Sequence, residues 1–378
     1  MKKLIKKIIG FLFELLTLKK NVIVFESNPD LSDNTYYVFK ELLNKGYNSK
    51  YKFVWFLYSS NKNDHPQYKN VKYINANKTF NRLFYKHKAK AMIFCNRYLE
   101  NVNNKQVTFF LQHGEQIKNV SFYYEGMPTS INYGISTSPE MAARDDKLYK
   151  QPQGKFVPIG FARNDELVGP KIDLHPLFPN REFDKVIAWY PTVRQNKHKD
   201  DDNSVTHPIS FIWDIETAKE INSFAKERKV LLVVKVHPAQ KDLFSDISNL
   251  SNIAFIDDSY LKEHGLVSYS FLRSTEALLT DYSSIYYDYM VTDKPIGFVW
   301  DDIEEFKKNI GFVVEDEILE GGEKIYQIDE FKKFILDISL SKDNNQKQRR
   351  KIRDRMITYI DNQNSSRVSE FIISKISK

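Results

Sequence analysis

The feature that most constrains the fold of this 378-residue chain is a series of short apolar segments that lack polar alternation. Stretches with helical periodicity separate them, for example at 35–46 and 79–88. The segments lie at 22–26, 53–57, 71–74, 91–94, 107–111, 131–136, 155–160, 185–190, 230–236, 253–255, 277–279 and 296–299. Strands that are apolar on both faces are typical of parallel sheets covered by helices. The sequence therefore predicts an α/β protein.

The chain is long enough for two domains, each with its own core. Residues 171–183 contain two prolines and no periodic apolar face, which indicates a linker. We therefore predict one α/β domain at 21–178 and a second at 184–355, each a doubly wound parallel sheet. A helix within 356–378 could cross back to the first domain. We expect the domains to face each other across a cleft, with ligands at the carboxyl ends of the strands.

Residues 1–20 predict an amphipathic helix on a membrane surface, because apolar side chains share one half of a helical wheel. The expected membrane contacts are Lys2, Lys3, Lys6, Lys7, Ile8, Phe11, Leu12 and Leu15. The apolar run is too short to span a bilayer, which needs about 20 residues, and no signal-peptide cleavage site follows it. We expect a peripheral position on the cytoplasmic face of the cell membrane, against its anionic leaflet. A helix packed on its own domain is the alternative.

The net charge of +7 favours anionic partners: phosphorylated substrates, an anionic membrane or nucleic acid. The basic run Arg349-Arg350-Lys351 could bind nucleic acid, but we interpret it as facing lipid headgroups or solvent, and expect no nucleic-acid partner. No CxxC or HExxH motif points to zinc. We interpret the acidic run 200–202 as a solvated loop. The sequence thus implies no cofactor, and although a divalent metal could take part, no motif for one is present.

Polar clusters directly follow five of the predicted strands. They are His113-Gly114, Arg163-Asn164-Asp165, Pro191-Thr192-Val193-Arg194, His237-Pro238 and Thr280-Asp281-Tyr282-Ser283-Ser284. A single His or Arg at a strand end is more often structural than catalytic. Because the carboxyl ends of parallel strands meet at one edge of a sheet, five such clusters indicate a functional site.

The cluster at 280–284 combines a strand end with hydroxyl and carboxylate side chains before a predicted helix. Such side chains can cap the helix, and free N–H groups at a helix start also favour an anion. An ordinary capped junction and a phosphate site both fit this pattern. We interpret Asp281 as a cap that stabilises the turn, and not as a metal ligand or a base.

In order and spacing, these motifs resemble the CDP-glycerol glycerophosphotransferase family, the teichoic acid primases and polymerases. The similar segments are 112–114, 160–165, 191–194, 235–238, 280–284 with Asp288-Tyr289, Lys294-Pro295 and Gly311-Phe312, and the resemblance spans roughly 22–334. It implies a membrane-associated enzyme of GT-B architecture. Such an enzyme transfers a polyol phosphate from a CDP-activated donor to a hydroxyl acceptor and releases CMP.

The resemblance implies a role for each cluster. His113 would be the general base, since a neutral imidazole can accept the proton of the attacking hydroxyl. Cations and hydrogen-bond donors would stabilise the diphosphate and the leaving group. The predicted donor- and phosphate-binding residues are Gly114, Arg163, Asp165, Pro191, Thr192, Arg194, Lys235, His237, Thr280, Ser283 and Ser284.

The chain departs from the family pattern at four positions. The common Trp-His-Gly-Thr motif reads Gln112-His113-Gly114-Glu115, Ala162 stands where Pro is usual, and Val193 stands where Trp is usual. The histidine, the arginines and the hydroxyls are retained, so these differences bear more on substrate choice than on chemistry. Glu115, beside the presumed base, could alter contacts with the donor polyol or the acceptor.

The expected partners are a CDP-activated polyol, with glycerol favoured, and a lipid-linked glycan or a growing teichoic acid or capsule polymer. The donor polyol, the acceptor, priming as against elongation, and the oligomeric state stay open. Two other classes also fit the sequence. One is a GT-B glycosyltransferase that uses a nucleotide sugar in cell-surface polysaccharide synthesis, and the other is a non-catalytic, membrane-peripheral binding protein.

Overall fold

The computed structural model describes residues 21–119, 126–192, 209–212, 214–236 and 249–377, and its chain forms two compact units. Unit 1 comprises Met1–Glu115, Ser121–Asp165 and Met356–Lys378, and unit 2 comprises Gln116–Val120 and Glu166–Arg355. The expected linker at 171–183 therefore belongs to unit 2. Its apolar side chains Leu174, Leu177 and Phe178 are buried, and the Ile172 N–H donates to Ser274 Oγ (2.9 Å).

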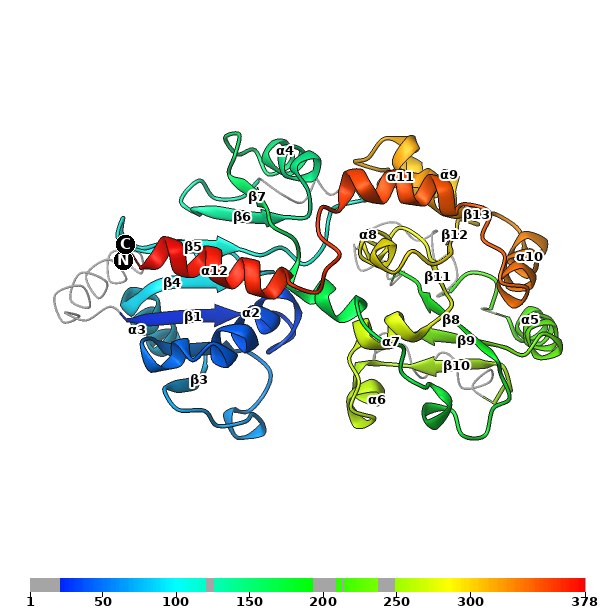
Figure 1. Ribbon diagram of the computed structural model, residues 1–378, viewed down its shortest axis with the longest axis horizontal. Coiled ribbons are helices and arrows are strands. Elements are labelled where there is room, and N and C mark those ends of the chain that lie inside the picture. Colours follow the sequence, from blue (N-terminus) through cyan, green and yellow to red (C-terminus); the bar gives the residue numbers. More distant parts are fainter. Residues whose placement is uncertain (1–20, 120–125, 193–208, 213, 237–248, 378) are drawn as a thin grey trace, which may run out of the picture. The chain divides into compact units, whose positions relative to one another are not determined.

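Unit 1 contains a seven-stranded sheet in the order β3-β2-β1-β4-β5-β6-β7, with every pairing parallel. The strands are β1 (Val22–Glu26), β2 (Lys52–Leu57), β3 (Val71–Asn75), β4 (Ala89–Phe94), β5 (Val107–Phe110), β6 (Tyr133–Ser136) and β7 (Phe156–Pro158). The helices are α2 (Asp33–Asn44), α3 (Thr79–Lys88), α4 (Pro139–Leu148) and α12 (Asn364–Ile376). Figure 1 shows α12 lying along the same sheet as α2, although more than 300 residues separate them in the chain.

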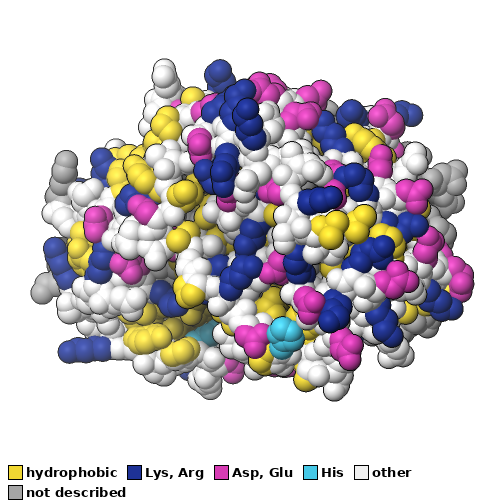
Figure 2. All heavy atoms as spheres, turned by 45° about the vertical axis from the view of Figure 1, so that its right-hand side comes forward, with side chains coloured by type: hydrophobic (Ala, Val, Ile, Leu, Met, Phe, Trp, Pro, Cys, Tyr) yellow, Lys and Arg dark blue, Asp and Glu magenta, His cyan; other side chains and the backbone are white. Residues whose placement is uncertain are grey.

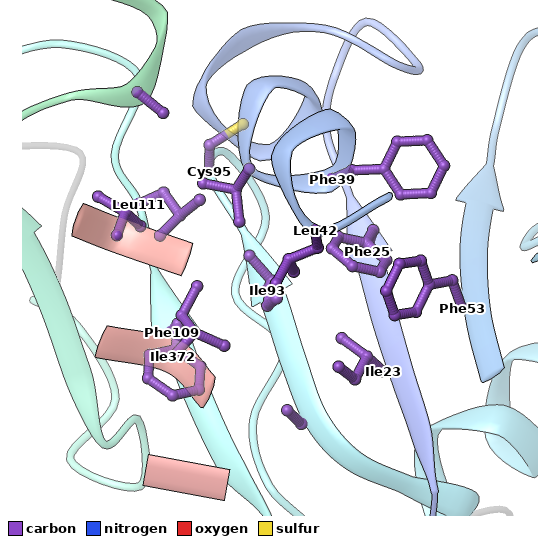
Figure 3. Packing of buried hydrophobic residues seen from close by; sticks show 14 of the residues in the cluster. Ile23, Phe25, Phe39, Leu42, Phe53, Ile93, Cys95, Phe109, Leu111 and Ile372 are labelled. Atoms are coloured by element: carbon purple, nitrogen blue, oxygen red, sulfur yellow. The ribbon is translucent and has the colours of Figure 1, made fainter. Parts of the chain in front are cut away.

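Both faces of the unit 1 sheet are buried, which explains why its strands lack polar alternation. One face packs against α2 and α12, and Figure 3 shows Phe25 and Phe53 of the sheet beside Phe39 of α2, and Phe109 of the sheet beside Ile372 of α12. The rings of Phe25 and Phe39 meet edge to face, with centroids 5.2 Å apart. The other face carries the alternate strand residues and packs against α3 and α4.

The C-terminal helix begins later than the sequence indicated, at Asn364 instead of near residue 356. Asn362 adopts a left-handed backbone conformation (φ 53°), so a right-handed helix cannot run through this residue. The Asp165 carboxylate then accepts the N–H groups of Asn364 and Ser365 (2.8 Å each) and so caps the first turn of α12. The last part of the chain is thereby fixed to unit 1.

Unit 2 contains a six-stranded parallel sheet in the order β10-β9-β8-β11-β12-β13. The strands are β8 (Lys185–Tyr190), β9 (Val230–Lys235), β10 (Ile253–Ile256), β11 (Ala277–Thr280), β12 (Ile296–Val299) and β13 (Glu323–Ile325). The helices are α5 (Ile215–Glu227), α6 (Asp258–Glu263), α7 (Ser268–Ser274), α8 (Ile285–Tyr289), α9 (Ile303–Asn309), α10 (Ile328–Ser339) and α11 (Gln346–Met356). The core on one face joins the sheet to α5 and α10.

The interpretation of the basic run on α11 as a solvent- or lipid-facing surface is wrong for Arg349. Its side chain is fully buried and forms hydrogen bonds to both oxygens of Asp343 and to the backbone carbonyl of Asp293. Arg350 also forms an ion pair with Asp293 (2.6 Å). A buried guanidinium must be paired, so this part of the run anchors α11 to its own unit.

Among the described helices, none combines the length and the apolar character that crossing a bilayer requires. The amphipathic helix predicted for residues 1–20, with all its expected membrane contacts, lies outside the described residues. On the face drawn in Figure 2, Lys and Arg side chains are interspersed with Asp and Glu. The positive net charge is therefore not gathered into a single patch on this face.

Candidate active site

His113 lies on a turn after β5 that buried polar contacts hold in place. Gln112, directly before it, has a left-handed backbone (φ 57°) and no exposed surface. Its side-chain amide donates to the carbonyl of Ile135 (2.9 Å) and to Asp145 Oδ2 (2.8 Å), and its oxygen accepts the Tyr149 hydroxyl (3.1 Å). The His113 side chain itself is exposed to solvent. A fixed backbone with an exposed imidazole is suited to proton transfer.

Arg163, which follows β7, contacts the same turn. Its guanidinium donates to the His113 carbonyl (2.7 Å) and forms an ion pair with Asp33 (2.7 Å), and its side chain is only 8% exposed. Asn34 extends the network, because its amide donates to the Gln112 carbonyl (2.9 Å) and its oxygen accepts the Arg163 N–H (3.1 Å). Two charged groups and an amide thus connect three strand ends of unit 1.

These surroundings lower the pKa of His113 below its ordinary value. Partial desolvation by the surrounding protein atoms is the largest cause, although the side chain keeps access to solvent, and the positive charge of Arg163 acts in the same direction. The Asp33 carboxylate and a backbone hydrogen bond at Cys95 oppose the shift. A lower pKa keeps the imidazole neutral near pH 7, the form that can accept a proton.

Glu115 is buried and does not face solvent. Its Oε1 accepts the hydroxyl of Ser136 (3.1 Å) and both the N–H (3.1 Å) and the hydroxyl (2.8 Å) of Thr137. Burial raises the pKa of Glu115, and that of neighbouring Asp145 is raised by burial and by the charge of Glu115. An influence of Glu115 on substrate choice would therefore act through the His113 turn.

The segment 160–165 has a structural use in addition to its predicted role. Gly160 has a left-handed backbone (φ +88°), and a Cβ there would lie 2.0 Å from Asn364 Oδ1, so only glycine allows α12 to approach. Both oxygens of Asp165 cap the same helix. A role of Asp165 in donor binding stays a prediction.

In unit 2, the ends of the neighbouring strands β8 and β11 are tied together by side chains. Asp281 accepts the N–H of Thr192 (2.8 Å) and its hydroxyl (2.6 Å), and also the N–H of Tyr282 (2.5 Å). The Thr280 hydroxyl donates to the Tyr190 carbonyl (2.9 Å) and is fully buried. Thr280 thus supports the backbone here, while Thr192 is partly exposed.

Ser283 and Ser284 lie in the turn after β11, and both are partly exposed. Helix α8 behind them is only five residues long, with Ser283 Oγ accepting the Ile285 N–H at 3.4 Å. Tyr282 holds the turn from below: its ring stacks on Phe306 with centroids 3.6 Å apart, and its hydroxyl donates to Asp302 (2.6 Å). The two serine hydroxyls are therefore presented by a firmly packed turn.

Of the remaining predicted residues, Lys235 ends β9 and pairs with Asp258 (2.8 Å), with its ammonium 5.4 Å from the centre of the Tyr190 ring. Pro191 follows β8 and is partly exposed, and Gly114 is buried. Arg194 and His237 lie outside the described residues. The structure thus groups His113, Gly114, Arg163 and Asp165 in unit 1, and Pro191, Thr192, Lys235, Thr280, Ser283 and Ser284 in unit 2.

The sequence analysis did not identify Asp33 and Asn34 as members of the site. They begin α2, the first helix after the buried strand β1, and this place near the carboxyl end of a strand was the signal that could have found them. Within the described ranges, no group of three or more His, Cys, Asp or Glu side chains is arranged to hold a metal ion.

Two parallel α/β sheets, each with polar side chains beyond its carboxyl edge, define a fold of the GT-B type. A variant of the wall teichoic acid polymerase TagF, soaked with CDPG, has a similar structure, with a TM-score of 0.73 at 19% identity over 95% of this chain and 90% of that one. The similarity to a UDP-N-acetylglucosamine 2-epimerase from Listeria monocytogenes is lower. Its TM-score is 0.57 at 11% identity, and the match covers 95% of this chain and 97% of that one. These likenesses establish the fold.

The sequence profile of the CDP-Glycerol:Poly(glycerophosphate) glycerophosphotransferase family matches residues 9–374. The chain belongs to this family. It is also 22% identical over 279 residues to the teichoic acid ribitol-phosphate primase of Bacillus spizizenii, covering 70% of this chain and 67% of that protein. The resemblance seen in the motifs is thereby confirmed. The family name refers to glycerol and the relative's name to ribitol, so the polyol is not resolved.

Proposed function

We propose that this protein transfers a polyol phosphate from a CDP-activated polyol to a hydroxyl of a lipid-linked glycan or a growing teichoic acid or capsule polymer. The acceptor oxygen forms a bond to the β-phosphorus, the bond from that phosphorus to the bridging oxygen breaks, and CMP leaves. The acceptor's proton passes to His113. Glycerol phosphate is the first donor group to test, with ribitol phosphate second.

The observation that carries this proposal is the fixed His113 turn within a chain that matches the family along nearly its whole length. Arg163 holds the His113 carbonyl, and the surroundings lower the pKa of the imidazole. In unit 2, Ser283 and Ser284 supply hydroxyl donors for the donor's phosphates, while Thr192, whose hydroxyl donates to Asp281, lies at the neighbouring strand end. We further propose that residues 1–20 hold the enzyme on the inner face of the membrane.

A screen for nucleotide release tests the proposal. The full-length protein is incubated with membranes carrying acceptor and, separately, with CDP-glycerol, CDP-ribitol and UDP-sugars, and the nucleotide products are resolved by mass spectrometry. We expect acceptor-dependent release of CMP from one of the two CDP-polyols. Release of UDP without CMP would instead show a nucleotide-sugar glycosyltransferase. If no nucleotide is released while CDP still binds, the protein is a binding protein.

A further inference from the structure

Lys118 belongs to unit 2, although it follows His113 by only five residues. The segment around it pairs with the chain after α9: the Val313 N–H donates to the Ile117 carbonyl (3.0 Å), and the Asn119 N–H donates to the Gly311 carbonyl (2.9 Å). Lys118 and Phe312 form an antiparallel bridge between them. The backbone of Lys118 is therefore fixed by the Gly311-Phe312 motif.

The side chain of Lys118 reaches the end of β8. Its ammonium donates to Thr192 Oγ1 (3.3 Å), and the Thr192 hydroxyl in turn donates to Asp281 Oδ1 (2.6 Å). A chain of two hydrogen bonds thus connects the ammonium of Lys118, through the Thr192 hydroxyl, to the Asp281 carboxylate. Asp281 already accepts three hydrogen bonds from Thr192 and Tyr282.

The charge of Lys118 is only partly compensated. Lysine carries three donor hydrogens, and Thr192 provides one neutral acceptor. In the part of the chain that the structure describes, no carboxylate forms an ion pair with this ammonium, and burial lowers its pKa while Asp281 raises it. A partly buried cation is stabilised when an anion completes its contacts. Lys118 is also partly exposed, so a ligand can reach it.

We propose that Lys118 binds the diphosphate of the CDP-activated donor, and that Thr192 and Asp281 position its ammonium at the carboxyl ends of β8 and β11. This inference rests on the proposed function and adds a donor-binding residue that the motifs did not mark. It also gives the segment 113–118 two tasks, because the base lies at one end and the phosphate-binding cation at the other. The covalent chain keeps the two Cα atoms within about 18 Å of each other.

Calorimetric titration of the full-length protein with CDP and with CMP tests this inference. We expect Lys118→Met to weaken CDP binding about 10- to 100-fold, as the loss of a charge-assisted hydrogen bond predicts. CMP binding should weaken less, because CMP lacks the β-phosphate. Lys118→Arg should restore part of the CDP affinity. Asp281→Asn should reduce the preference for CDP over CMP and raise the KM for the donor more than it lowers kcat.

Lys185→Met is the matched control, since Lys185 is a partly exposed lysine at the opposite end of β8 whose ammonium binds the carbonyls of Ile338 and Ser339 (2.7 and 2.9 Å). Its CDP affinity should equal that of the wild type. Should Lys118→Met fail to fold, Lys118→Gln removes the charge but keeps a donor for Thr192 and gives the same comparison.

Unchanged affinity of the Lys118 variants for both nucleotides overturns the inference, even if the wild type releases CMP from a CDP-polyol. An equal loss for CDP and CMP also overturns it, because that pattern indicates a general structural effect. If the wild type releases no CMP from any donor but binds CDP through Lys118, the proposed function fails while the phosphate-binding role stands.

Discussion

Unit 1 and unit 2 both end parallel strands in polar side chains, but they use positive charge differently. In unit 1, Arg163 forms an ion pair with Asp33 and also donates to the backbone carbonyl of His113. In unit 2, the ammonium of Lys118 donates to the neutral oxygen of Thr192, and it forms no ion pair with a carboxylate of the described residues. A neutralised arginine can fix a turn without attracting a ligand, whereas an uncompensated lysine favours an anion. This difference agrees with the roles that we propose, a general base at the first edge and phosphate binding at the second.

The largest effect is expected when the proposed general base, His113, is replaced. We expect His113→Asn to lower kcat by about 10²- to 10⁴-fold, the usual contribution of a general base. Donor affinity should change little, because the donor is assigned to unit 2. Rates of CMP release and CDP binding are measured on the same preparation. His264→Asn, an exposed histidine of unit 2, is the control. Full activity of His113→Asn would remove the assigned mechanism.

The Asp33–Arg163 pair provides the next test, because the comparison treats it as structural. Asp33→Asn leaves a guanidinium that is 8% exposed without its charged partner, and we expect the free energy of unfolding to fall by about 3 kcal/mol. Asp361→Asn removes a partner of the more exposed Arg367 in the same unit and should cost less than about 1 kcal/mol. Urea denaturation measures both. Equal losses would show that Arg163 is not held by this pair.

The strands of both units could be predicted where they form apolar runs, because such runs are visible in the local sequence. The predicted strands at 185–190 and 296–299 coincide with β8 and β12, and the helix at 79–88 with α3. β13 was missed, since Glu323–Ile325 contains a single apolar residue and is placed by pairing with β12. Such pairing leaves no periodic signal in three residues.

The site was predictable to the extent that its residues follow strands. Asp33 was not identified because a carboxylate at the start of a helix fits an ordinary cap equally well. Lys118 could not be found because its neighbours depend on contacts between 117–119 and 311–313, almost 200 residues apart. The carboxylates of Asp165 and Glu115 turned out to be engaged inside unit 1, which only the packed structure reveals.

The pH dependence of the reaction tests how the charges around His113 set its pKa. Because the fold lowers the pKa of His113, the rate should stay high below pH 6.5 and fall only as the imidazole is protonated at lower pH. Asp33 raises this pKa and Arg163 lowers it, so Asp33→Asn should move the acidic limb of kcat/KM to lower pH and Arg163→Gln to higher pH. An acidic limb above pH 6.5 in the wild type, or shifts of the same sign, would contradict the assignment.

The smallest expected effect concerns the buried acid behind the His113 turn. Burial raises the pKa of Glu115 in the folded state, so its share of stability is present below the unfolded value of 4.5 and is lost as pH rises through the folded value. Glu115→Gln keeps an oxygen for Ser136 and Thr137 but cannot ionise. Relative to the wild type, we expect it to reduce the loss of unfolding free energy as pH rises. Urea denaturation across pH measures this, with the exposed Glu140→Gln as control. If the wild type and Glu115→Gln lose stability equally as pH rises, the Glu115 carboxylate ionises at no cost to the fold, and the His113 turn does not depend on a neutral acid beneath it.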